Sequence, residues 1–110
     1  MVGRHQAKVL LRRHRAEVVS CLENLKKVLL ELTHGTPVGE IPFSFFRSEG
    51  NGVFRVGQTT VASAQEMRLY VTFVFVRGVA YVLSIGTKNT QARDIADARR
   101  AARQLKKELS

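Results

Sequence analysis

The segment MRLYVTFVFVRGVAYVLSIG, residues 67–86, decides the fold. Both of its halves are rich in β-branched and aromatic residues, and the Arg77-Gly78 step between them is typical of a tight turn. We therefore predict a β-hairpin built from strands at 67–76 and 79–86. Alternate residues of the first strand face opposite ways, and neither set is plainly polar. The hairpin is accordingly expected to lie in the centre of a sheet.

Three further strands are predicted upstream of the hairpin. FSFFR at 43–47 and VFRVG at 53–57 are short apolar runs, and EGNG at 49–52 provides the turn between them. A third run, AKVLLR at 7–12, is read as a short first strand. Together these segments predict a small twisted sheet, antiparallel or mixed.

Two helices complete the predicted domain. The first covers 15–35 and ends at Gly35, with apolar residues spaced by three and four positions, namely Val18, Cys21, Leu22, Leu25, Val28, Leu29 and Leu32. The second covers about 91–109, with apolar residues on one side (Ile95, Ala98, Ala102, Leu105, Leu109) and cations on the other (Arg93, Arg99, Arg100, Arg103, Lys106, Lys107). The predicted fold is α+β, a sheet packed by the N-terminal helix with a basic C-terminal helix.

Composition points to one domain with an anionic partner. A chain of 110 residues suffices for a single domain over 1–110, and 18 Lys plus Arg against 9 Asp plus Glu make a net charge of +9. Such an excess attracts phosphate-rich partners, so nucleic acid is the leading partner class. The same charge would also serve solubility or an acidic protein partner, and charge alone does not separate these readings.

Cysteine content and hydropathy bear on the compartment. Cys21 is the only cysteine, so an internal disulfide is impossible, which favours a reducing, cytoplasmic location. The longest apolar run is well short of the roughly 20 residues that a membrane span needs. We therefore expect neither secretion nor a membrane partner.

Several kinds of catalytic site lack the residues they require. His5, His14 and His34 have no Cys or carboxylate partner at metal-ligand spacing, so they are read as surface histidines and no metal site is predicted. The glycine-containing stretches do not have the spacing of a phosphate or dinucleotide loop, and no cofactor is expected. No Ser-His-Asp or Cys-His arrangement is visible either. An enzyme built on this chain would work without metal, cofactor or covalent nucleophile.

Four cations lie at predicted strand ends: Arg47, Arg55, Arg68 and Lys88. An antiparallel meander brings such positions together on one face or rim if their parity agrees, and clustered Arg and Lys side chains grip a phosphate and stabilise charge on it. RNA is the substrate that such a site could cut, because its 2′-hydroxyl can attack the adjacent phosphate. The alternative is that each is an ordinary solvated charge.

The order of the predicted elements resembles the RelE and ParE superfamily of bacterial toxins. VLSIGTKNTQ, residues 82–91, looks like the final strand of those toxins, and SIGTK is similar to the Ile-Gly-His-Arg ending of RelE-type members. GTKNTQARDIADARRAA, residues 86–102, resembles the Lys-Lys-Thr-Gln turn and following helix of HigB-type members. The resemblance spans nearly the whole chain.

This resemblance implies roles for individual residues. Arg55, Arg68 and Lys88 match positions that contact the scissile phosphate, and Thr90 and Gln91 match the polar residues that follow. Arg47 and Arg93 add cations beside them and are expected to bind RNA. Lys88 is the expected proton-transfer group, because an ammonium among cations gives up its proton more readily.

The resemblance also implies an activity and partners. Such members are the toxins of type II toxin-antitoxin systems: they cleave messenger RNA on the ribosome, and an antitoxin, expected here to be a helix-turn-helix protein, restrains them. Two alternatives stay open. ParE-type members of the same fold inhibit gyrase, and a non-catalytic RNA-binding protein would need only the charge.

Overall fold

The computed structural model describes residues 12–59, 61 and 66–109. Its elements are α2 (Arg15–Thr33), η1 (Val38–Glu40), β1 (Phe46–Ser48), β2 (Phe54–Gly57), β3 (Met67–Val74), β4 (Val79–Thr87), η2 (Lys88–Thr90) and α3 (Gln91–Leu109). The α+β class, with an N-terminal and a C-terminal helix, is confirmed. Residues 7–11 of the strand predicted at 7–12 lie outside the described residues, and Arg12, which is described, is helical rather than extended.

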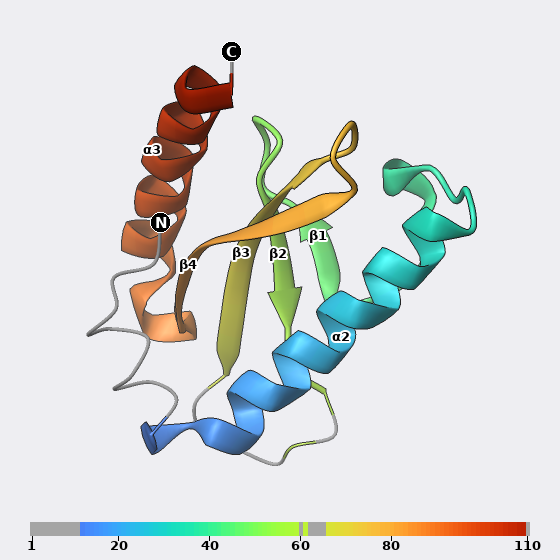
Figure 1. The fold of residues 1–110 in the computed structure, drawn as a ribbon. Coiled ribbons are helices and arrows are strands. Elements are labelled where there is room, and N and C mark those ends of the chain that lie inside the picture. Colours follow the sequence, from blue (N-terminus) through green and yellow to red (C-terminus); the bar gives the residue numbers. More distant parts are fainter. Residues whose placement is uncertain (1–11, 60, 62–65, 110) are drawn as a thin grey trace.

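The four strands form one antiparallel sheet in the order β1-β2-β3-β4 (Figure 1). The predicted hairpin is therefore present, but of its two strands only β3 is interior. The prediction that the whole hairpin is central is wrong for β4, which is one of the two edge strands of the described sheet. The chain continues from β4 directly into η2 and α3. Helix α3 then packs against β4, so this apolar strand is covered by a helix on its face.

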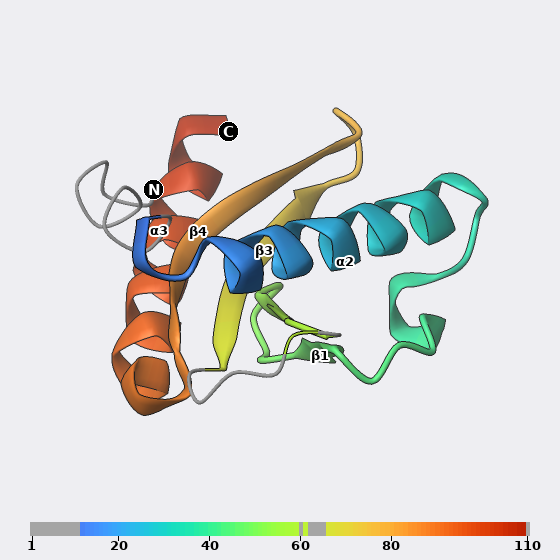
Figure 2. The ribbon, with the colours of Figure 1, turned by 90° about the horizontal axis from the view of Figure 1, so that it is seen from below.

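Helix α2 packs on one face of the sheet, where the main apolar core lies (Figure 2). Val18, Cys21, Leu25 and Val28 are buried there, as predicted. Leu22 is the exception, because 45% of it is exposed. Ser20 and Asn24 are buried in its place.

These two polar residues hold the end of β2. The Ser20 hydroxyl donates to the Thr59 carbonyl at 2.5 Å, and the Asn24 amide donates to the Gly57 carbonyl at 2.8 Å. Buried polar groups are tolerated when they are hydrogen-bonded in this way, so the helix stripe includes residues that hydrophobicity alone does not select.

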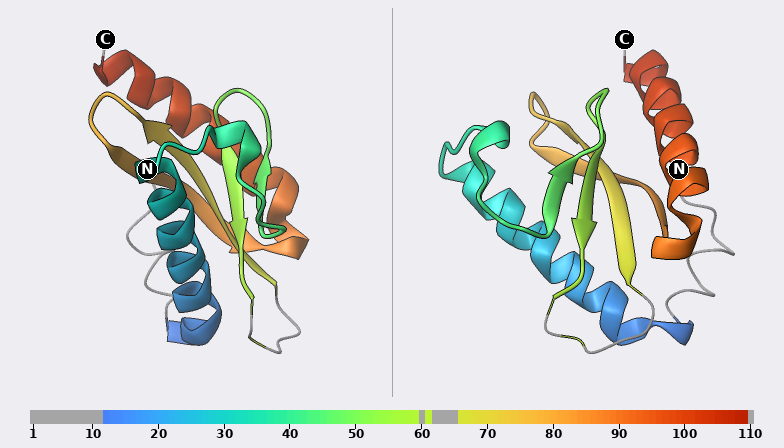
Figure 3. Two further views of the ribbon diagram at one scale, coloured as in Figure 1. Left: turned by 90° about the vertical axis from the view of Figure 1, so that its right-hand side faces the viewer. Right: turned by 180° about the vertical axis from the view of Figure 1, so that it is seen from behind.

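Helix α3 packs on the opposite face of the sheet, against β3 and β4 (Figure 3). Ala98 contributes to a smaller core with Val53, Tyr70 and Leu83. A β-bulge helps to form this core: the pairing moves from Tyr70 with Ser84 to Val71 with Val82, so Leu83 is an extra residue in β4. Leu83 enters the core, while the Ser84 hydroxyl donates to the Asp94 carbonyl at 2.7 Å. Two successive residues of β4 thus contact α3.

The beginning of α3 lies directly on the backbone of β4. A Cβ atom added at Gly86 would lie 1.7 Å from Oδ2 of Asp94 and 2.6 Å from Oγ1 of Thr90. Asp94 is fully buried, with an exposed fraction of 0%. Its carboxylate therefore occupies the space that a side chain at position 86 would need.

This contact predicts that Gly86→Ala destabilises the fold. The new methyl group would force Asp94 or α3 away from the sheet, and overpacking of this kind costs about 2 kcal/mol or more. Urea denaturation followed by circular dichroism measures the free energy of unfolding. Gly39→Ala is the matched control, because nothing lies within 4 Å of a Cβ there, and it should stay within about 0.5 kcal/mol of the wild type. Equal stability of both variants would contradict the close packing of Asp94.

Candidate functional site

The register of the sheet places three of the predicted site residues on one face. Arg47 of β1 pairs with Arg55 of β2, and Arg55 pairs with Tyr70 of β3. Arg68 lies two residues before Tyr70, and residues two apart in a strand face the same way. Tyr70 contributes to the core beneath α3, so this face is the one that α3 partly covers. Arg47, Arg55 and Arg68 therefore lie on the same face of the sheet, which is the condition that the predicted cluster required.

Arg55 and Arg68 are the two most enclosed cations of this set. Each has only 13% of its side chain exposed. Arg55 Nε lies 3.5 Å from Glu49 Oε1, and Arg68 Nη2 lies 3.4 Å from Glu66 Oε2. Arg68 also donates to the side-chain oxygen of Gln91, at the first residue of α3. Burial and ion pairing together orient both guanidinium groups.

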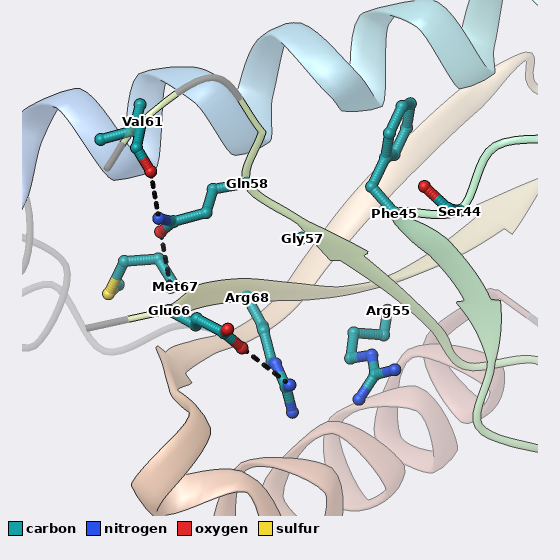
Figure 4. Close-up of a pocket in the computed structure, with 9 residues that line it drawn as sticks. All are labelled: Ser44, Phe45, Arg55, Gly57, Gln58, Val61, Glu66, Met67 and Arg68. Atoms are coloured by element: carbon teal, nitrogen blue, oxygen red, sulfur yellow. Dashed lines mark hydrogen bonds and ion pairs between the residues drawn. The ribbon is translucent and has the colours of Figure 1, made fainter. Parts of the chain in front are cut away.

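A pocket of about 310 Å³ opens where these two arginines lie, and Figure 4 shows both side chains extending from the sheet towards α3. It forms at the end of β2 and the start of β3. Its described lining consists of Ser44, Phe45, Arg55, Gly57, Gln58, Val61, Glu66, Met67 and Arg68. Gly57 pairs with Arg68 and has no side chain, so nothing projects from β2 between the two guanidinium groups.

The pocket wall is held by Gln58. Its side-chain oxygen accepts the Met67 N–H at 2.8 Å, and its amide donates to the Val61 carbonyl at 3.5 Å (Figure 4). These bonds connect the segment after β2 to the first residue of β3. They make Gln58 a support for the pocket instead of a free ligand group.

The electrostatics of the pocket favour an anion. Burial lowers the pKa of Arg55 below its usual value, the nearby charge of Arg68 lowers it further, and Glu49 opposes the shift. An arginine nevertheless keeps its proton at any ordinary pH. Two cations therefore repel each other across the pocket, and a bound dianion or phosphodiester would relieve that repulsion.

Tyr70 lies beneath these arginines and is fully buried. Burial raises the pKa of Tyr70 above its ordinary value, and the adjacent Arg68 charge opposes the shift. No described group meets the Tyr70 hydroxyl in good hydrogen-bond geometry. The hydroxyl therefore lies close to both pocket arginines, and its contact with Arg68 partly offsets the rise in the pKa of Tyr70 without meeting strict hydrogen-bond geometry.

Lys88 lies in the turn between β4 and α3, as its place in the sequence indicated. It is exposed at the start of η2, and its backbone N–H donates to the Glu66 carbonyl at 3.0 Å. Lys88 is not among the described residues that line the pocket. The structure thus sets Lys88 beside Glu66 at the rim, next to the arginine pair but outside it.

The other predicted RNA-binding residues are partly engaged within the protein. Thr90 accepts the Thr87 N–H at 3.1 Å and hydrogen-bonds to the Asp94 carboxylate, so it builds the turn that carries Lys88. Gln91 is bound to Arg68. Arg93 and Arg47 are exposed, and Arg93 Nε lies 3.7 Å from Asp94 Oδ1.

Three acidic residues at the site were missed by sequence reasoning. Glu49 and Glu66 each pair with one arginine, and Asp94 fixes the turn after β4. For Glu66 a signal existed, because it stands two residues before Arg68 and so shares its face. For Glu49 and Asp94 the sequence contains no such signal, because their roles arise from how the β1–β2 turn and α3 pack in the folded protein.

The buried carboxyl group of Asp94 predicts a pH-dependent stability. Burial raises the pKa of Asp94 above 3.8, against the opposing hydrogen bond from Thr90 and the charge of Arg93. The folded state then binds the proton more tightly than the unfolded state, so stability is lost as the pH rises through the raised pKa. Asp94→Asn keeps an acceptor oxygen and cannot ionise. The variant should therefore gain stability relative to the wild type as the pH rises above about 4, the ordinary pKa of an aspartate.

Urea denaturation at several pH values tests this expectation. Asp97→Asn is the control, because Asp97 is a partly exposed carboxylate on the same helix that pairs with Arg100. A difference between Asp94→Asn and the wild type that does not change with pH would contradict the raised pKa.

Neither metal-ligand geometry nor membrane-spanning segments in the described residues, nor similarity to known proteins, assigns a function to the site. Among the described ranges, no group of three or more His, Cys, Asp or Glu residues is arranged to hold a metal ion. No helix in the described part of the chain is long and apolar enough to cross a membrane. Comparison with protein-family models, curated proteins and solved structures finds no match to this chain.

Proposed function

We propose that this chain is an endoribonuclease that cleaves messenger RNA through attack of a ribose 2′-hydroxyl on the adjacent phosphate. One observation carries the proposal: Arg55 and Arg68, from neighbouring strands, are both enclosed at one pocket and both oriented by carboxylates. Two guanidinium groups so placed can hold a phosphodiester and stabilise the charge that develops on it. Positioning the 2′-hydroxyl in line with the leaving oxygen raises the rate of cleavage further.

In this mechanism the 2′-oxygen loses its proton and bonds to phosphorus, and the bond from phosphorus to the 5′-oxygen breaks. The products are a 2′,3′-cyclic phosphate and a 5′-hydroxyl. Glu66 is the only carboxylate among the described pocket residues and is the proposed acceptor of the 2′ proton. Lys88, at the rim beside Glu66, is the proposed donor to the 5′-oxygen.

The biological role proposed for this activity is that of a toxin in a type II toxin-antitoxin system. The resemblance of residues 82–102 to RelE and HigB-type toxins supports it, as does the net charge of +9, which suits ribosome-bound messenger RNA. The protein would then act in the cytoplasm and be restrained by a small antitoxin of the helix-turn-helix type. A positive surface of this kind favours an antitoxin with an acidic segment.

Removal of either pocket arginine tests the cleavage site. Arg55→Ala and Arg68→Ala should each lower the rate of RNA cleavage by about two to three orders of magnitude, because each removes a group that stabilises the transition state. The measurement is single-turnover cleavage of a labelled transcript by purified protein, with and without ribosomes. Arg77→Ala is the matched control, since Arg77 is an exposed arginine in the β3–β4 turn, and it should cleave at the wild-type rate.

Two results would contradict the assignment. Wild-type cleavage by folded Arg55→Ala and Arg68→Ala variants would remove the pocket from the reaction. Intact transcripts in the presence of wild-type protein and ribosomes, combined with inhibition of gyrase, would favour the ParE-like function instead.

Lys88 can be tested separately because it lies at the rim and contributes no described packing. Lys88→Ala should lower cleavage by roughly two orders of magnitude or more if the ammonium donates the proton. Lys88→Arg keeps the charge but cannot give up a proton near neutral pH, so rescue by arginine would indicate phosphate stabilisation and no rescue would indicate proton transfer. A Lys88→Ala variant that is folded and fully active would make Lys88 an ordinary surface residue. Lys27→Ala, exposed on α2, controls for loss of one charge.

A further inference from the structure

A second concave surface lies outside the arginine pocket, between α3 and the turn that joins β1 to β2. It is a hollow of about 470 Å³, lined by Asn51, Arg99, Ala102, Arg103 and Lys106. We refer to these five residues as the α3 groove. Three of the five residues are cations, and Ala102, which has a small side chain, lies among them. An apolar hollow adjoins the groove and includes Val74 and Leu105.

The cations of the α3 groove form a stripe along the helix. Arg99, Arg103 and Lys106 are spaced by four and three positions, which places them on one side of α3 over about 10 Å of its length. Arg99 is fixed at one end, because its Nη2 donates to the Glu49 carbonyl at 2.8 Å. Its Nε is buried and has no hydrogen-bond partner among the described residues. That N–H is a hydrogen-bond donor that lacks an acceptor oxygen in the described part of the chain.

The opposite wall is the turn Gly50-Asn51-Gly52, in which three successive residues have positive φ angles of 84°, 56° and 76°. This left-handed run folds the chain back tightly and brings Asn51 towards the helix. Glycine is favoured at position 50 by its φ of 84°, and a Cβ there would be in ordinary contact with Arg99 Nη2 at 4.0 Å, so the turn lies directly beside the helix side chain. The groove is therefore a built feature of the fold and not only a basic helix surface.

One residue joins the α3 groove to the arginine pocket. The Glu49 carboxylate pairs with Arg55 in the pocket, and the Glu49 carbonyl accepts from Arg99 in the groove. Cations thus continue from Arg68 and Arg55, past Glu49, to Arg99, Arg103 and Lys106. A flexible chain of phosphates is the ligand whose charges are spaced to follow such a path.

We propose that the α3 groove binds a second phosphate of the RNA strand whose scissile phosphate lies between Arg55 and Arg68. The inference rests on the proposed function and specifies its substrate as single-stranded RNA several nucleotides long. A single strand can bend across Glu49, and one of its bases can pack on the apolar hollow beside Val74 and Leu105. A dinucleotide would fill the arginine pocket alone.

The test compares binding of a dinucleotide and a decanucleotide, both single-stranded and 2′-O-methylated so that no cleavage occurs. Fluorescence anisotropy on the full chain measures each affinity at several salt concentrations. Arg103→Ala/Lys106→Ala should weaken binding of the decanucleotide by about tenfold and lower its salt slope by about 0.7, the value for one phosphate of a single strand, with dinucleotide binding unchanged. Arg103→Glu should weaken decanucleotide binding further. Lys26→Ala/Lys27→Ala is the matched control, because it removes the same charge from exposed positions on α2.

Three results would overturn the proposal. The first is an equal loss of affinity in the two double variants, which would mean that only summed charge matters. The second is an equal loss for the dinucleotide and the decanucleotide. The third is tighter binding of duplex DNA of the same length, with the same dependence on Arg103 and Lys106.

The outcome is separable from that of the proposed function. Length-dependent binding through the α3 groove without any cleavage by the wild type would reject the endoribonuclease and keep the groove as an RNA-binding site. Cleavage that depends on Arg55, with no effect of length or of the groove variants, would reject the groove and keep the enzyme.

Discussion

The contact between the Asp94 carboxylate and the backbone of Gly86 is the constraint on which the functional surface depends. It allows α3 to begin directly against β4, and the Ser84 and Thr90 hydroxyl groups hold the same residue from two sides. With the start of α3 fixed, Gln91 lies within reach of Arg68, and two turns later Arg99 reaches the β1–β2 turn. A buried carboxylate thus sets the position of the cations at both ends of the surface.

The two faces of the sheet differ in what they bury. The α2 face contains a continuous apolar core, and its buried polar side chains Ser20 and Asn24 are hydrogen-bonded to the segment after β2. The α3 face buries polar atoms that lack good partners, including the Tyr70 hydroxyl and the Arg99 Nε. The larger apolar core lies on the first face, and the second face combines a smaller core with polar groups that cost stability when they are unpaired.

Local sequence patterns predicted much of this fold. Strong β-propensity with a short turn placed the β3–β4 hairpin, and the apolar spacing of residues 91–109 matched α3 at both ends. Patterns of this kind do not report which strand lies at an edge or where an extra residue enters a ladder, so the position of β4 and the bulge at Leu83 were not predicted. The prediction that Leu22 is buried was wrong for a related reason. Hydrophobicity does not reveal that Asn24 has a backbone hydrogen-bond partner and is buried instead.

The candidate site was predictable only for residues whose face of the sheet follows from the alternation of side chains along a strand. Arg47, Arg55 and Arg68 share a face because the strands pair directly, and that outcome needed the register as well as the residue types. Glu49, Asp94 and the α3 groove arise from contacts between elements far apart in the chain.

The shortness of β1 has a consequence for self-association. β1 contains only three residues and lies at an edge of the sheet formed by the described strands, with Arg47 exposed at its middle. A second molecule that extended the sheet by antiparallel pairing at this edge would bring two arginines close together across a very short ladder. The charge of Arg47 therefore discourages this edge from joining another sheet, which protects concentrated protein from aggregation.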